Sequence, residues 1–163
     1  MRNVYIRKTE RTEIFTLDHD ITVTGISLQK SGLPISFDSL GKLWVMYGEK
    51  YRTSPVMEYS VSLNTIPDYI AGCAEEFKGE LPEEFVVQTI PKGKYIKDTF
   101  SADSFEELTG SALMKRNVAG WAKKNGVKIN RLFSSEVYPW AEFAKGNFEM
   151  YTLTPIKEQG EQK

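Results

Sequence analysis

Ser36-Phe37-Asp38-Ser39-Leu40 opens the first predicted helix, and Ser104-Phe105-Glu106-Glu107-Leu108 opens the second. Both segments follow one pattern: a serine, a phenylalanine, an acid, any residue and a leucine. In the second copy, Ser104 and Glu107 have the spacing of a capping box, in which each side chain satisfies a free backbone donor at the helix start. Ser36 is the equivalent N-cap candidate in the first copy. The recurrence indicates that the chain consists of two halves built alike.

The segments around the two helix starts predict the same order of elements in both halves. Strand patterns occupy residues 12–17, 21–28, 57–63, 69–75, 85–90, 94–100, 133–138 and 148–154. The halves, about 13–78 and 83–157, each contain the order strand, helix, strand, strand. Two such units can pair into one antiparallel sheet with two long helices on one face, an α+β fold with a pseudo-twofold axis. A groove on that axis is a natural ligand site.

The chain divides into an arm, one domain and a tail. Residues 1–12 are polar and charged and are expected to form an N-terminal arm. Residues 13–157 are expected to form a single domain, with the charged segment 76–84 as the linker between its halves. Residues 158–163 are polar and are expected to form a disordered tail. A length of 163 residues is the usual size of one domain.

The composition excludes several classes of function. The chain has 21 Lys and Arg against 22 Asp and Glu, so its net charge of −1 gives no overall attraction to nucleic acid or anionic membranes. A single cysteine, Cys73, and a single histidine, His19, exclude an intrachain disulfide and multi-histidine or cysteine-based metal sites. No apolar run reaches the length of a membrane span, and the N-terminus lacks a signal-peptide core. We expect a cytoplasmic protein that needs no metal or cofactor.

The first helix carries an aromatic stripe. At spacings of three and four, between about 36 and 52, the sequence has Phe37, Leu40, Trp44, Tyr47 and Tyr51. Such a stripe usually packs into a core, but it can also form one wall of an aromatic pocket. Trp and Tyr carry polar tips, so they tolerate a partly wet cavity better than Leu does. The sequence pattern leaves both interpretations open.

The second helix is expected to run without a break from Ser104 to Asn125-Gly126, where the glycine ends it. Trp121 lies near its end. The basic pairs Lys115-Arg116 and Lys123-Lys124 are expected on the solvent face of this helix rather than at a phosphate site.

One carboxylate stands inside the predicted strand Phe133-Ser134-Ser135-Glu136-Val137-Tyr138. Because a strand alternates its faces, Glu136 and Tyr138 point to one side of the sheet. Phe133 and Val137 point to the other side and are the more apolar pair, so periodicity alone would turn Glu136 towards solvent. Glutamate is not favoured in strands. Either its face is wet, or the face is covered and the carboxylate needs a partner.

Five short motifs occur in a characteristic order and spacing. They are Asp68-Tyr69-Ile70-Ala71-Gly72, Gly93-Lys94-Tyr95, Trp121 followed by Asn125-Gly126, Glu136-Val137-Tyr138, and Pro155-Ile156. Together they resemble the gyrase-inhibitor-like (GyrI-like) family of effector-binding domains, which also occurs as the ligand domain of AraC-type and multidrug-sensing MerR-type regulators. The resemblance covers about residues 13–157.

This resemblance implies a duplicated fold with a central cleft that binds small molecules, often aromatic or cationic ones. The candidate ligand-binding residues are Glu136 at the cleft floor, Tyr138 and Trp121 from the resemblance, and Trp44, Tyr47 and Phe37 from the aromatic stripe. Ser135 stands where the family usually has an aromatic residue, which would leave space or polarity beside the glutamate. The chain has no room for an attached helix-turn-helix domain, so we expect no direct binding of nucleic acid.

Three functions are open at this stage. In the first, an aromatic cleft with Glu136 as anionic anchor binds a lipophilic or aromatic cation, and the protein is a stand-alone sequestering or regulatory module. In the second, Glu136 is the general base of a hydrolase of reactive electrophilic small molecules. In the third, the protein is an interaction module, such as a gyrase-inhibitor analogue, that binds a protein partner or a second copy of itself.

Overall fold

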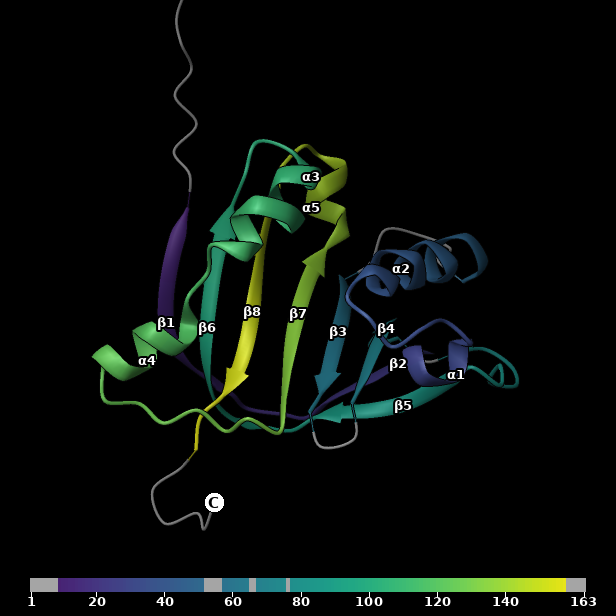
Figure 1. Cartoon of the computed structure of the whole chain (residues 1–163), viewed down its shortest axis with the longest axis horizontal. Coiled ribbons are helices and arrows are strands. Elements are labelled where there is room, and N and C mark those ends of the chain that lie inside the picture. Colours follow the sequence, from purple (N-terminus) through teal and green to yellow (C-terminus); the bar gives the residue numbers. More distant parts are fainter. Residues whose placement is uncertain (1–8, 52–56, 65–66, 76, 158–163) are drawn as a thin grey trace, which may run out of the picture.

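Alternating segments of the sequence form the strands of one antiparallel sheet. The computed structural model describes residues 9–51, 57–64, 67–75 and 77–157, which Figure 1 shows as a ribbon. Within these residues the sheet has eight strands in the order β1-β6-β8-β7-β3-β4-β2-β5. Their bounds are β1 Glu10–Leu17, β2 Ile21–Ser27, β3 Met57–Leu63, β4 Asp68–Cys73, β5 Phe85–Ile90, β6 Gly93–Ser101, β7 Phe133–Pro139 and β8 Glu149–Pro155. All eight predicted strands are confirmed. The first begins inside the segment expected as an arm, whose residues 1–8, like the expected tail 158–163, lie outside the described residues.

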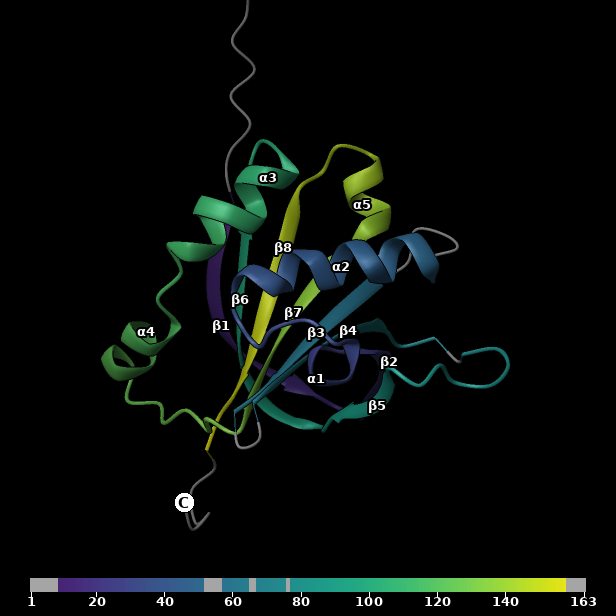
Figure 2. The ribbon, with the colours of Figure 1, turned by 45° about the vertical axis from the view of Figure 1, so that its right-hand side comes forward.

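Helices pack on one side of the sheet. Figures 1 and 2 show α2, α3 and α5 on this side, while α4 lies apart, near β1 and β6. The bounds are α1 Leu28–Ser31, α2 Asp38–Lys50, α3 Phe105–Glu107, a π-helical segment η1 Leu108–Ala112, α4 Val118–Lys124 and α5 Trp140–Ala144. The sequence does not predict α1 or α5. In the part of the chain that is described, no helix is both long and apolar enough to cross a bilayer.

The two predicted helix starts have different outcomes. Ser104 caps α3 as predicted, because its hydroxyl accepts a hydrogen bond of 3.1 Å from the backbone N–H of Glu107. The expectation for Ser36 is wrong. Phe37 occupies the N-cap position of α2 without a side-chain hydrogen bond, and the hydroxyl of Ser36 lies 3.2 Å from that of Ser39 instead. The shared sequence pattern therefore produces two different local starts.

The second predicted helix is not continuous, so the expectation of two long helices is wrong. After α3 the helix continues as the wider π-helical segment η1. The helical conformation is then interrupted before α4 begins. Gly110 lies in η1, where a glycine weakens a helix. Asn117 begins α4 as its N-cap, and its side-chain oxygen accepts a hydrogen bond of 3.0 Å from the N–H of Gly120.

Arg116 ties this break to the sheet. Its guanidinium makes two hydrogen bonds to Asp98 on β6, of 2.8 Å from Nε to Oδ2 and 2.6 Å from Nη2 to Oδ1. The hydroxyl of Thr12 on β1 donates to the same carboxylate at 2.8 Å. Only 2% of the Asp98 side chain and 17% of the Arg116 side chain are exposed. The solvent position predicted for Arg116 is therefore wrong, because a buried carboxylate requires a cationic partner.

Both faces of the sheet are buried, in different ways. On one face all eight strands contribute to a single core made of Leu17, Val23, Tyr59, Val61, Ile70, Ile90, Tyr95, Val137 and Leu153. The other face carries two separate clusters. One lies beneath α2 around Leu43 and Tyr47, and the other lies beneath α3 and α5 around Phe100 and Phe143. Trp44 packs against both clusters and marks the boundary between them.

Replacing Gly72 with alanine is expected to destabilise the fold. Gly72 on β4 and Gly25 on β2 face each other in the sheet. A Cβ at Gly72 would overlap the carbonyl oxygen of Thr24 and the Cα of Gly25, which are backbone atoms that cannot turn away. We expect a loss of about 1–3 kcal/mol in the free energy of unfolding, measured by urea denaturation.

Gly41→Ala in α2 is the matched control for this substitution. A Cβ at Gly41 meets nothing within 4 Å. Because alanine favours a helix more than glycine does, a gain of about 0.5–1 kcal/mol is expected. A Gly72→Ala protein as stable as the wild type would contradict the close approach of β2 and β4.

Candidate ligand-binding site

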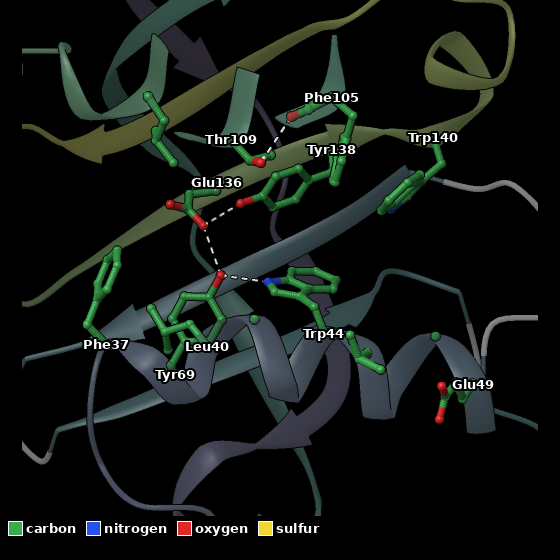
Figure 3. Close-up of a pocket in the computed structure, with 14 residues that line it drawn as sticks. Phe37, Leu40, Trp44, Glu49, Tyr69, Phe105, Thr109, Glu136, Tyr138 and Trp140 are labelled. Carbon is green, nitrogen blue, oxygen red and sulfur yellow. Dashed lines mark hydrogen bonds between the residues drawn. The ribbon is translucent and has the colours of Figure 1, made fainter. Parts of the chain in front are cut away.

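A cavity of about 520 Å³ lies between the two helical clusters. Its walls come from α2, α3, η1 and α5, and its floor comes from β4 and β7 (Figure 3). The lining residues are Phe37, Leu40, Gly41, Trp44, Val45, Gly48, Glu49, Tyr69, Phe105, Thr109, Leu113, Glu136, Tyr138 and Trp140. The volume is in the range of small-molecule sites.

Glu136 lies on the floor of this cavity, where β7 pairs with β3. Its Oε1 accepts hydrogen bonds from Tyr138 OH at 2.6 Å, Tyr69 OH at 2.9 Å and Ser60 Oγ at 3.1 Å. Among the residues that the structure describes, Oε2 has no hydrogen-bond partner. The carboxylate is therefore held through one oxygen and presents the other to the cavity (Figure 3).

The two tyrosines act as hydrogen-bond donors to this carboxylate. Burial, together with the negative charge of Glu136, raises the pKa of Tyr69 and of Tyr138 well above the ordinary tyrosine value. Both phenols therefore keep their protons at neutral pH. The indole Nε1 of Trp44 donates to the hydroxyl of Tyr69 at 2.9 Å, which leaves the Tyr69 proton directed at Glu136. This chain of hydrogen bonds connects α2 to β4 and β7.

Aromatic rings surround the carboxylate. The rings of Trp44 and Tyr138 meet edge to face, with 5.2 Å between their centroids and 71° between their planes. Phe105 and Trp140 form a second ring pair in the wall, with centroids 5.2 Å apart. The charged residues that line the cavity are acidic, namely Glu49 and Glu136. In the described part of the chain, no group of three or more His, Cys, Asp or Glu is placed to hold a metal ion.

The structure brings together four of the candidate residues at the cavity. Glu136, Tyr138, Trp44 and Phe37 all line it. Phe37 stands at the rim, where 77% of it is exposed. Glu136 is half-buried and faces the cavity beneath the helices, whereas Val137 is buried on the opposite side of the sheet, as the periodicity indicated.

Two other candidates lie elsewhere. Tyr47 is buried beneath α2, where it follows Ser39 and Leu43 in the row of residues that faces the sheet. Its ring meets that of Trp44, a residue of the cavity wall, edge to face with 6.0 Å between the ring centroids. Trp121 is half-buried in α4 and does not line the cavity. The break after η1 displaces α4 towards the β1 side, and Trp121 moves with it.

Ser60 and Tyr69 bind Glu136 but were not candidate residues. Tyr69 stands in one of the motifs behind the family resemblance, which is a signal that could have indicated it. Ser60 alternates with apolar neighbours in β3, a pattern that usually places a serine in solvent. Ser135, which was expected to leave space or polarity beside Glu136, does not line the cavity, because strand alternation turns its side chain to the opposite face. There its hydroxyl donates to the carbonyl of Ser60 at 2.6 Å.

Comparisons with solved structures show a shared fold. No family model and no curated protein sequence matches this chain. An integron cassette protein from the mobile metagenome of Vibrio cholerae has a TM-score of 0.61 and 14% identity, over 93% of this chain and 100% of that one. SAV2435, solved with bound tetraphenylphosphonium, has a TM-score of 0.61 and 9% identity, over 90% and 94% of the two chains. EcmrR, solved in a complex with DNA, has a TM-score of 0.59 and 12% identity, over 93% of this chain and 58% of its own.

Proposed function

We propose that the cavity binds lipophilic organic cations, with Glu136 as the anionic anchor. The observation that carries this proposal is a carboxylate set among aromatic rings in the cavity. Among the described residues, one of its oxygens has no hydrogen-bond partner and no basic side chain lines the cavity. A partly desolvated carboxylate is costly unless it is paired. A ligand cation restores the pairing, and each facing ring adds about 0.5–2 kcal/mol through its quadrupole. Neutral ligands of the same shape gain only from burial.

The comparisons and the motifs support this class of ligand. Tetraphenylphosphonium, bound by SAV2435, is a lipophilic cation. We propose that the chain is a GyrI-like effector-binding domain, in which two copies of one unit meet at the β3–β7 pair. The strand order supports the duplication, because β3-β4-β2 and β7-β8-β6 hold corresponding places on the two sides of that pair. Such a domain would sense or sequester its ligand in a regulatory circuit.

A pair of matched ligands tests the role of charge. Phenyltrimethylammonium and tert-butylbenzene have nearly the same shape, and only the first carries a charge. We expect the cation to bind at least about tenfold more tightly, which corresponds to about 1.4 kcal/mol. Quenching of tryptophan fluorescence is a suitable measurement because Trp44 and Trp140 line the cavity. Equal affinities would mean that the cavity is an ordinary apolar pocket, and would refute the anchor role of Glu136.

One observation favours a second candidate function, a hydrolase. The Oε2 atom of Glu136, which lacks a protein partner among the described residues, is placed to accept a proton from a water molecule in the cavity. Turnover of a strained electrophile that disappears in Glu136→Gln would identify an enzyme. Saturable binding of the same compound without product would identify a binding protein.

A further inference from the structure

The cavity contains a second carboxylate, Glu49, near the C-terminal end of α2. Glu49 is exposed, whereas Glu136 is half-buried on the floor. Trp44, which reaches the Glu136 network through Tyr69, precedes Glu49 by five residues, so their Cα atoms are about 7.5 Å apart along the helix axis. Figure 3 shows the two carboxylates well apart, on either side of Trp44. They belong to two different parts of the same cavity, Glu136 to its floor and Glu49 to the wall that α2 forms.

Most of the other residues that line this cavity are apolar. They include Val45 and Gly48 from α2 and Trp140 from α5. Gly48 contributes no side chain, so it leaves room beside the helix. Among the described residues, no cation forms an ion pair with Glu49. The site therefore combines two separated acidic groups with an otherwise largely apolar lining.

We propose that the preferred ligands of this site are elongated dications, with one charge at Glu136, the other at Glu49 and an apolar spacer between them. This inference rests on the cation-binding function proposed above. Once the first charge is bound at Glu136, the second is held at high effective concentration near Glu49. Because Glu49 is exposed, its ion pair has the strength of a surface pair, which raises affinity about two- to fivefold. Salt screens such a pair strongly.

A series of bis-quaternary compounds tests the proposal. The probes are two phenyldimethylammonium groups joined by alkyl spacers of increasing length, with phenyltrimethylammonium as the single-charge reference. A dication with two equal ends binds twofold better for statistical reasons alone. We expect an optimum spacer at which the affinity exceeds the reference by a further two- to fivefold. This excess should disappear at high ionic strength.

Two variants separate the outcomes. Glu49→Gln is expected to abolish this excess and leave only the statistical factor of two, whereas Glu80→Gln, an equal change of charge at an exposed position outside the cavity, should keep the excess. An excess that persists in Glu49→Gln, or the absence of any excess in the wild type, would overturn the dication proposal while single-charge binding stands. If phenyltrimethylammonium itself does not bind, the cation-binding function fails, and this inference fails with it.

Discussion

Glu136→Gln is expected to weaken the binding of tetraphenylphosphonium on the order of 100-fold, which corresponds to about 2.7 kcal/mol. Glutamine retains an oxygen that can accept the hydrogen bonds of Tyr69 and Tyr138, so the floor of the cavity keeps its shape. The substitution removes the charge and replaces the other carboxylate oxygen with an amide NH2 group. Loss of one partner from a desolvated charge pair costs about 2–5 kcal/mol, because the other partner is left uncompensated.

Two controls accompany this measurement, which is made by calorimetric titration. Glu80→Gln makes the same change of charge outside the cavity and should bind the cation as the wild type does. Tyr138→Phe keeps the charge of Glu136 and removes one of its three donors, so its loss should be smaller than that of Glu136→Gln. An affinity of Glu136→Gln within threefold of the wild type would show that the carboxylate is not the anchor.

Asp98→Ala is expected to lower the free energy of unfolding by about 3 kcal/mol. The substitution leaves Arg116 without its bidentate partner in a site where little of the guanidinium is exposed. Removal of one member of a buried ion pair costs about 3–5 kcal/mol, and the lower value applies because Arg116 retains some contact with solvent. For a chain of this size the midpoint of thermal unfolding should fall by roughly 6–12 °C.

A double variant distinguishes lost pairing from general damage to the core. Asp98→Leu combined with Arg116→Met replaces both charges with apolar groups and is expected to recover most of the lost stability. If Asp98→Ala unfolds within 1 kcal/mol of the wild type, the pair does not anchor the break after η1. The anchor also matters for the site, since η1 and the residues after it place Thr109 and Leu113 in the cavity wall.

The strands could be predicted because their signal is local. Alternation within β2, β3 or β8 depends only on neighbouring residues, and it survives whatever the strand pairs with. The prediction of a continuous second helix was wrong for the opposite reason, because the contact at its break is not local. The helix breaks beside Arg116, which pairs with Asp98 on the sheet, a residue 18 positions earlier in the chain. The helical periodicity of this segment does not depend on that contact, so the sequence pattern does not reveal the break.

The site was predictable only in part. Periodicity identified Val137 as buried and left the facing of Glu136 undecided, because a covered polar face and a wet one look alike in sequence. The family resemblance pointed to the cleft. Tyr69 and Ser60 complete the carboxylate site through the pairing of β4, β3 and β7, which is a tertiary property. Trp121 was a candidate through the family resemblance, and the break in the second helix leaves it outside the cavity.

A crystal structure of the protein with tetraphenylphosphonium tests the central claim most directly. We expect the phosphonium in the cavity between α2 and α3, with Glu136 as the nearest acidic group and its phenyl rings against Trp44 and Trp140. A cation bound elsewhere on the surface, with the cavity around Glu136 unoccupied at saturating ligand, would contradict the account.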